Sequence, residues 1–189
     1  MRVLGISGSL RRGSHNTALL GHAGELIEAE GADFAIYDTW REVPIYDADL
    51  DVERPHAAVV RMREAVREAD AVFFATPEYN SSVPGGLKNA VDWLSRPSPT
   101  KGALRSKPVA VVGASTGAFG ATWAQAELRK VLSAAGARVV DGELALGHAM
   151  DRFNESGRLN DENLEEQMRE VVRTLLAEAA YGPRVQQVL

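Results

Sequence analysis

The feature that most limits the fold of this chain is an alternation of short apolar runs with longer amphipathic stretches. Three runs, Arg2–Ser7, Ala71–Thr76 and Pro108–Ala114, have the length and composition of strands. The last two are apolar at nearly every position, which is typical of strands buried on both faces of a parallel sheet. Weaker strand patterns occupy residues 32–38 and 138–146.

Five stretches between or after these runs repeat apolar residues at helical spacing. They cover residues 16–30, 55–69, 87–94, 123–135 and 164–179. Five strands alternating with five helices predict an α/β protein whose parallel sheet is covered by helices on both faces. The 189 residues contain no linker or repeat. We therefore predict one domain over residues 1–181, followed by a tail of residues 182–189.

Composition excludes several classes of function. The chain has no Cys, which removes disulfide scaffolds, thiolate metal sites and catalytic thiols. Its net charge of -5 argues against nucleic-acid binding, which needs clustered cations. No apolar run approaches the roughly 20 residues that span a bilayer, and the first residues lack the pattern of a signal peptide. We expect a cytoplasmic protein that binds neither nucleic acid nor membrane.

No metal site is predicted. The four histidines show neither the spacing of paired ligands nor a carboxylate partner on the same helix face, and we expect them at the surface or at helix caps. The acidic stretch 46–53 lacks the ligand spacing of a calcium loop and is interpreted as solvated.

Ligands of such folds bind beyond the carboxyl ends of the strands, so the loops after Ser7, Thr76 and Ala114 are the candidate sites. The first loop, SGSLRRGSHN over residues 7–16, combines glycines, hydroxyl groups and arginine. It can direct backbone N–H groups toward an anion at a helix N-terminus. Its potential phosphate ligands are Ser9, Arg11, Ser14, Asn16 and Thr17. The alternative is an ordinary glycine turn with Ser14 or Asn16 as helix cap.

The first loop matches neither of two common nucleotide motifs. Ser14 and His15 stand where a Walker A loop requires Lys followed by Ser or Thr. The glycines at positions 5, 8 and 13 do not fit Gly-x-Gly-x-x-Gly.

The second loop, TPEYNSSVPGGLKN over residues 76–89, is stiffened by Pro77 and Pro84. Gly85 and Gly86 allow a close approach of the backbone. Tyr79 offers a stacking surface, and such a rigid loop can present N–H groups to a planar heterocycle. The alternative is a stiff connector with a helix cap.

The third loop, residues 113–120, contains Gly-x-Ser-x-Gly around Ser115 between a strand and a helix, as in a nucleophile elbow. Asp141 and His148 follow in the order of a hydrolase triad. Against a triad stand the short chain, the missing oxyanion segment and the few residues between the acid and the base. A serine hydrolase using Ser115 remains the less favoured alternative.

Taken together, these motifs resemble the NADPH-dependent FMN reductase family, the flavodoxin-like group that includes quinone, azo and chromate reductases. SGSLRRGSHN is similar to the phosphate loop of that family. PEYNSSVPGGLKNAVDWLSR is similar to its flavin-ring loop and the following helix, and the resemblance extends from Met1 to about Ala180. It implies a flavodoxin-like three-layer sandwich with a five-stranded parallel sheet of order 2-1-3-4-5.

The resemblance also implies a set of cofactor-binding residues. Around the FMN phosphate it places Ser9, Arg11, Ser14, Asn16 and Thr17. Along the isoalloxazine it places Pro77, Glu78, Tyr79, Asn80 and Ser81, and at the other edge of the ring Ser115 and Gly117. Two positions depart from the family pattern. Ser81 replaces a frequent Gly, which is tolerable if its φ is negative, and Gly120-Ala121 replaces a frequent Gly-Gly.

The implied activity is an FMN-dependent NAD(P)H oxidoreductase. It would pass hydride from NADPH or NADH through FMN to a quinone, azo, metal-oxyanion or free-flavin acceptor, with no catalytic side chain. The resemblance further implies a homodimer or homotetramer whose partner subunit walls the flavin. Candidates for that wall, with core packing as the alternative, are Trp40, Tyr46, Trp93 and Phe119. A flavodoxin-like electron carrier without NAD(P)H turnover, or a family member that binds a partner without turnover, remains open.

Overall fold

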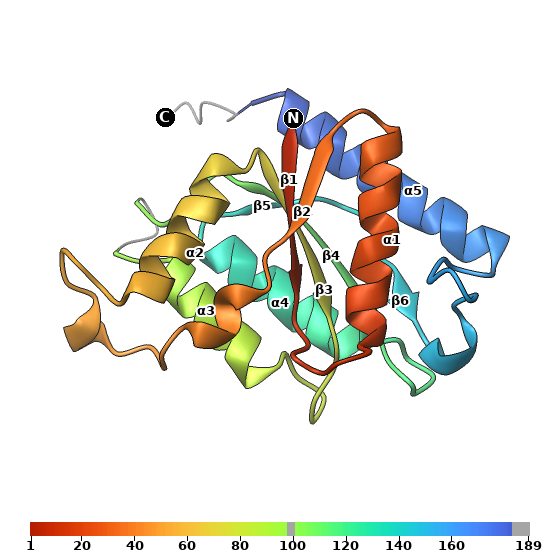
Figure 1. Cartoon of the computed structure of the whole chain (residues 1–189), viewed down its shortest axis with the longest axis horizontal. Coiled ribbons are helices and arrows are strands. Elements are labelled where there is room, and N and C mark those ends of the chain that lie inside the picture. The colour runs from red at the N-terminus through yellow and green to blue at the C-terminus, as the bar shows by residue number, and fades with distance from the viewer. Residues whose placement is uncertain (98–100, 183–189) are drawn as a thin grey trace.

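A computed structural model describes residues 1–97 and 101–182. Its centre is a parallel sheet of order β2-β1-β3-β4-β5, in which a short β6 also pairs with β4 (Figure 1). The strands are β1 (Arg2–Ser7), β2 (Asp33–Ile36), β3 (Ala71–Thr76), β4 (Pro108–Ala114), β5 (Arg138–Val139) and β6 (Ala145–Leu146). The predicted parallel sheet and its 2-1-3-4-5 order are therefore confirmed.

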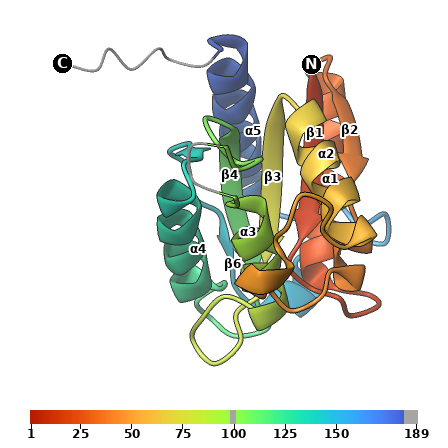
Figure 2. The same ribbon diagram turned by 90° about the vertical axis from the view of Figure 1, so that its left-hand side faces the viewer.

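Helices cover both faces of the sheet. The helices are α1 (His15–Ala29), α2 (Ala57–Glu68), α3 (Gly85–Leu94), α4 (Thr122–Ala134) and α5 (Glu162–Ala180). Residues of α1 and α5 pack on one face, and residues of α2, α3 and α4 pack on the other. Figure 2 shows α2 and α3 in front of the strands. The result is the three-layer sandwich that the alternating pattern predicts.

The central strands explain why two cores form. Every residue of β3 and β4 is buried. Because successive side chains of a strand point to opposite faces, Phe73 packs with α1 and α5 while Phe74 packs with α2, α3 and α4. This burial on both faces explains why the sequence of each strand is an apolar run without interruption.

The predicted fifth strand, residues 138–146, is interrupted. Only its ends pair with β4, as β5 and β6. Between them the chain turns at Gly142, whose φ is 130°. The Arg129 guanidinium donates to the Val140 carbonyl at 2.7 Å and to the Gly142 carbonyl at 3.1 Å. A side chain from α4 thus satisfies carbonyls that a continuous ladder would have paired.

Two predicted helix starts also shift. α2 begins at Ala57 rather than Pro55, because His56 is its N-cap and its Nδ1 accepts from the Ala58 N–H at 3.2 Å. Gly85 and Gly86 form the first turn of α3 instead of ending the second loop. The irregular segment 39–54 contains two short 3₁₀ helices, Thr39–Glu42 and Ala48–Leu50. Of the predicted tail, residues 183–189 lie outside the described residues.

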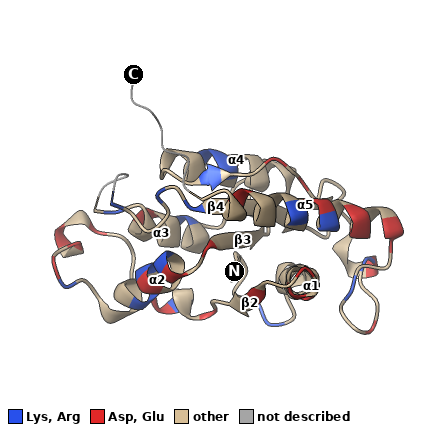
Figure 3. Cartoon of the chain, turned by 90° about the horizontal axis from the view of Figure 1, so that it is seen from above, with Lys and Arg blue, Asp and Glu red and all other residues tan. Residues whose placement is uncertain are grey.

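Basic and acidic residues are mixed along α2 and α5, as Figure 3 shows. Arg61 of α2 forms an ion pair with Glu42 of the 3₁₀ helix Thr39–Glu42, and Arg169 pairs with Glu165 within α5. Within the described ranges, none of the helices combines the length and apolar character needed to cross a bilayer.

Candidate functional site

The three candidate loops meet at one pocket. It has a volume of about 170 Å³ and lies beyond the carboxyl ends of β1, β3 and β4. Its lining includes eight of the predicted residues: Ser9, Arg11, Ser14, Asn16, Pro77, Glu78, Tyr79 and Ser115. It also includes His15, Ala114 and Thr116, which the sequence analysis did not single out. Residues more than a hundred positions apart are thus brought into one site by the parallel sheet.

The first loop ends in a capped helix with free donors. Ser14 is the N-cap of α1, and its Oγ accepts from the N–H groups of Asn16 at 3.2 Å and Thr17 at 3.4 Å. Among the described residues, the N–H groups of Arg12, Gly13 and His15 have no acceptor within the protein. The expected cap is therefore present, and it leaves donors free for an anion, since capping uses only two of the donors at this helix end.

Asn16 joins the first loop to the third. Its Nδ2 donates to the Ala114 carbonyl and its Oδ1 accepts from the Ala114 N–H, each at 2.9 Å. The residue is buried. Both ends of this amide are therefore engaged within the protein, which makes Asn16 a clamp between two loops of the pocket. Thr17 lies outside the small pocket, where its Oγ1 is 2.9 Å from the Ser7 Oγ.

The tip of the second loop turns away from the pocket. Tyr79 and Ser82 exchange two backbone hydrogen bonds of 3.1 Å around a two-residue turn at Asn80 and Ser81. The turn requires positive φ at both central residues, 52° at Asn80 and 58° at Ser81. The negative φ under which Ser81 would replace Gly without strain is therefore not observed. Neither residue lines the small pocket.

Glu78 has a structural role that its place in the sequence did not reveal. Its Oε2 accepts from the backbone N–H groups of Trp123 and Ala124, each at 3.1 Å. These are free donors in the first turn of α4, where a carboxylate is also favoured by the helix dipole. Glu78 thus lines the pocket and also caps a neighbouring helix.

A second carboxylate, Glu127 of α4, holds the same loop. Glu127 accepts from the Ser82 hydroxyl and from the Val83 N–H. The hydrogen bond from Ser82 is the main cause that lowers the pKa of Glu127 below its ordinary value, with the Val83 N–H second. Neither the Ser82 hydroxyl nor the Glu127 carboxylate was predicted as part of the site. Nothing in the sequence shows that α4 passes beside the second loop.

The third loop is fixed by its own backbone. The Ser115 Oγ accepts from the Gly117 N–H at 3.1 Å, and the Ser115 N–H donates to the Leu146 carbonyl at 3.0 Å. The His148 N–H donates to the Gly117 carbonyl at 3.0 Å. In the described part of the chain no hydrogen bond joins the Ser115 Oγ to the His148 ring, or that ring to Asp141. The hydrolase triad therefore lacks its geometry.

The structure also shows the conformation of Gly120-Ala121, which replaces the frequent Gly-Gly of the family. Gly120 and Ala121 both have positive φ, 58° and 62°. A Cβ on Gly120 would lie 2.2 Å from the carbonyl carbon of Ala145, so only glycine fits there. Ala121 is the N-cap residue of α4 and carries the strain of a left-handed conformation.

Two of the four aromatic candidates for a flavin or partner wall are core residues, and a third, Tyr46, is partly buried and packs against the core. Trp40 is buried against Gly86 and its Nε1 donates to the Ser7 carbonyl at 3.1 Å. Trp93 is fully buried, and Tyr46 packs edge-on against it with ring centroids 4.9 Å apart. Phe119 differs, because it is 66% exposed and packs against the half-exposed Trp123. The group that approaches the Gly86 backbone closely is therefore the buried indole of Trp40.

The residues of the small pocket fit the phosphate end of FMN. The N–H group of His15 at the start of α1, which has no acceptor among the described residues, and the Arg11 side chain supply donors and positive potential for a dianion. The volume suits a phosphate group, and Pro77 and Tyr79 also line the pocket.

Comparison with known proteins agrees with this geometry. The model of a family described as NADPH-dependent FMN reductase matches residues 1–151. An NAD(P)H-dependent FMN reductase of Pseudomonas aeruginosa is 41% identical over 176 residues, which cover 93% of each chain. A quinone reductase of Pseudomonas putida is 40% identical over 157 residues, covering 82% of this chain and 83% of the relative.

A solved structure is similar over nearly the whole chain. FerB, a flavoenzyme NAD(P)H:(acceptor) oxidoreductase from Paracoccus denitrificans, superposes with a TM-score of 0.84 at 32% identity. The match covers 95% of this chain and 97% of FerB. The flavodoxin-like architecture, the FMN cofactor and the NAD(P)H dependence expected from the sequence are thereby confirmed at the level of the family. The chain belongs to the NADPH-dependent FMN reductase family.

Proposed function

We propose that this protein is a cytoplasmic, homo-oligomeric oxidoreductase that uses FMN and NAD(P)H to reduce small-molecule acceptors, with quinones as the main class. The observation that carries the proposal is the meeting of three loops at a pocket lined by Arg11 and by His15, whose N–H group is unpartnered among the described residues. The quinone reductase among its relatives supports the choice of acceptor. The cytoplasm is proposed because NAD(P)H is the reductant.

The first loop is proposed to hold the FMN phosphate. The N–H groups of Arg12, Gly13 and His15 are available as donors at the start of α1. Arg11 and the hydroxyl of the buried Ser9 add side-chain donors at the pocket. Charge-assisted hydrogen bonds of this kind are about twice as strong as neutral ones, so this loop would supply most of the affinity. Ser14 and Asn16 would act by shaping the loop.

The second and third loops are proposed to hold the isoalloxazine ring. Pro77 and Tyr79 of the second loop and Ser115 of the third line the pocket. The bonds from Glu78 to α4 and from Glu127 to Ser82 keep the second loop in place before any ligand binds. Such preorganisation reduces the entropy lost on binding. Gly117, exposed at the rim, and the turn at Asn80 and Ser81 would contact the ring only at its edge.

FMN, when bound, supplies the two-electron hydride chemistry of the reaction. The protein itself would bind FMN, orient it and shield it from water. Glu78, the one carboxylate of the pocket, already accepts two N–H groups of α4, and we assign it no proton transfer. The partly buried Ser115 would help to keep water from one side of the ring. No side chain is proposed as a catalytic acid or base.

The exposed Phe119 and Trp123 are proposed to meet a second copy of the chain. Their rings pack edge to face with centroids 5.0 Å apart, where the third loop joins α4. Aromatic side chains are enriched at protein interfaces. A partner subunit that packs on this pair would form one side of the site.

The proposal is tested on the purified protein. We expect a yellow preparation that is bleached by NADPH or NADH under anaerobic conditions and recovers its colour when a quinone is added. A protein that binds no FMN and consumes no NAD(P)H would overturn the proposal. An electron carrier would bind FMN without steady-state NAD(P)H oxidation, and a hydrolase would cleave p-nitrophenyl esters and lose this activity in Ser115→Ala.

The phosphate assignment has a test of its own. FMN should bind far more tightly than riboflavin, which lacks the phosphate. Arg11→Gln should reduce this preference about tenfold, which corresponds to roughly 1.4 kcal/mol. Arg105→Gln removes an exposed arginine outside the pocket and serves as the matched control. Equal affinities for FMN and riboflavin would contradict the assignment.

A further inference from the structure

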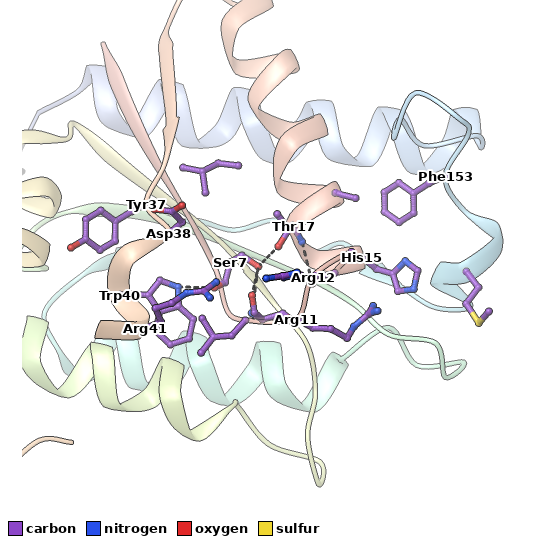
Figure 4. A pocket seen from close by; sticks show the side chains of 17 residues that line it. Ser7, Arg11, Arg12, His15, Thr17, Tyr37, Asp38, Trp40, Arg41 and Phe153 are labelled. Atoms are coloured by element: carbon purple, nitrogen blue, oxygen red, sulfur yellow. Dashed lines mark hydrogen bonds between the residues drawn. The ribbon is translucent and has the colours of Figure 1, made fainter. Parts of the chain in front are cut away.

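A second and larger cavity adjoins the proposed FMN phosphate pocket. Its volume is about 510 Å³, within the range of small-molecule sites. Figure 4 shows it around the first loop and the start of α1, with Trp40 and Arg41 on one side and Phe153 on the other. Ser9, Arg11, Ser14 and His15 line both cavities, so a ligand in the larger one would lie directly beside the smaller.

The lining of the larger cavity carries net positive charge. It contains three arginines, Arg11, Arg12 and Arg41, and a single carboxylate, Asp38. Within the described part of the chain, none of the three guanidinium groups forms an ion pair or a hydrogen bond. Elsewhere arginines of the same chain pair with acids, as Arg61 does with Glu42. A concentration of unpaired cations in a chain of net charge -5 indicates a place for an anion.

The cavity also offers apolar surface. Leu10, Ile36 and Met150 line it and are all solvent-exposed, with Met150 72% accessible. Phe153 is half-buried and stacks near His15 with an interplanar angle of 10°. Exposed apolar side chains beside unpaired arginines match a ligand that has both a flat ring and a phosphate. An adenosine phosphate has these two parts.

We infer that this cavity binds the adenosine end of NADPH, with Arg12 and Arg41 contacting its 2′-phosphate. This inference rests on the proposed function, because it assigns a subsite to the hydride donor of that reaction. The 2′-phosphate is the chemical difference between NADPH and NADH, and arginine is the usual residue that accommodates it. Arg11 lines both cavities, so it would stand between the FMN phosphate and this second anion. The cavity would therefore favour NADPH over NADH.

The inference is tested by direct binding to the FMN-loaded protein, so that the phosphate of FMN does not compete. Calorimetric titration should show adenosine 2′,5′-bisphosphate binding at least about tenfold more tightly than 5′-AMP. Arg12→Gln and Arg41→Gln should each weaken the bisphosphate about five- to tenfold, and raised salt should weaken it further. Arg105→Gln is the control, because Arg105 is exposed, unpaired in the described chain and outside the cavity.

Steady-state kinetics provide a second measurement. The ratio of KM for NADPH to KM for NADH should rise in Arg12→Gln and Arg41→Gln and stay constant in Arg105→Gln. Equal binding of the bisphosphate and 5′-AMP, or a bisphosphate affinity unchanged in a protein that carries both Arg12→Gln and Arg41→Gln, would overturn the inference. So would inorganic phosphate binding as tightly as the bisphosphate, because the adenosine would then contribute nothing. In each case FMN binding and NADH oxidation would still stand, which separates this failure from failure of the proposed function.

Discussion

Asn16 and Ala114 hydrogen-bond to each other in both directions, 98 residues apart in the sequence and each bond 2.9 Å long. The amide of Asn16 imitates a neighbouring strand at the end of β4, and so ties the start of α1 to the third loop. The position of the first loop relative to the third is thus set by a side chain that need not touch the ligand.

Replacement of Asn16 by Ala should lower both stability and FMN affinity. The Ala114 N–H and carbonyl would be left buried without partners, at a cost of about 2 kcal/mol. Urea unfolding of the apoprotein and fluorescence titration with FMN would measure the two effects. Asn163→Ala is the matched control, since Asn163 is exposed on α5, and it should change neither. A loss of FMN affinity at unchanged stability would show that Asn16 acts on the phosphate and is not primarily a clamp.

Glu78→Ala should destabilise the protein by about 1 kcal/mol, because two N–H groups in the first turn of α4 lose their acceptor. Glu78→Gln keeps an acceptor oxygen but loses the charge that favours a helix N-terminus, and should fall between wild type and Glu78→Ala. Denaturant midpoints of the three proteins would give this order. If Glu78 instead contacts the flavin closely, Glu78→Gln would reduce FMN affinity while leaving the stability of the apoprotein intact.

Ser81→Gly should stabilise the protein by about 1 kcal/mol. Ser81 has a φ of 58°, a conformation that costs an L-residue roughly this amount and costs glycine little. The side chain is exposed and outside the small pocket, so little else is lost. Thermal unfolding of Ser81→Gly and of Ser81→Ala, which keeps the Cβ, would separate backbone strain from loss of the hydroxyl. A gain in Ser81→Ala equal to that in Ser81→Gly would refute the strain argument.

These results show which parts of the molecule the sequence predicts. β3 and β4 were predictable to the residue, because burial on both faces leaves an apolar run without interruption. The interrupted fifth strand was not, since its carbonyls are satisfied by Arg129 from another element. Residue patterns report which face of an element is buried, and they carry no information on which distant side chain supplies a missing partner.

The candidate site was likewise predictable only in part. The glycines and hydroxyl residues of the first loop indicated a helix N-terminus that can hold an anion, and Ser14 indeed caps α1. The role of Glu78 as a cap for α4 was hidden, because it depends on how two loops are placed by the sheet. The indole of Trp40 was equally ambiguous, since tryptophan suits a ligand site and a core alike, and here it is buried.

The stability contributed by Glu127 should depend on pH. The hydrogen bonds from Ser82 and Val83 lower the pKa of Glu127 below 4.5 in the folded state. A carboxyl group with a lowered folded pKa contributes stability above its unfolded pKa and loses it as the pH falls through the folded value. The stability difference between wild type and Glu127→Gln should therefore be constant at pH 6 to 7 and shrink below pH 4.5. Urea midpoints across this range would test it, and a difference that grows on acidification would contradict the assigned sign.

Gly117 and Gly120 allow the proposed flavin contact of the third loop to be tested separately from its folding. A Cβ on Gly117 would come no nearer to the surrounding atoms than 3.5 Å, at the Ser115 Oγ, whereas a Cβ on Gly120 would overlap the backbone at Ala145. Gly120→Ala should therefore unfold the loop or the protein, at a cost of several kcal/mol, since backbone atoms must move and its φ of 58° disfavours alanine. Gly117→Ala should fold with nearly wild-type stability.

If the ring of FMN lies against the third loop, the added methyl group of Gly117→Ala would occupy space that the ligand needs. FMN affinity should then fall about tenfold at unchanged urea midpoint, and the absorption spectrum of the bound flavin should shift. Gly157→Ala is the control for a mutated loop glycine remote from the pocket, with open space around its Cβ and the strain of a positive φ. It should lose some stability and no FMN affinity. Wild-type FMN affinity and spectrum in Gly117→Ala would show that the ring is bounded elsewhere, which would leave Pro77 and Tyr79 of the second loop as its chief support.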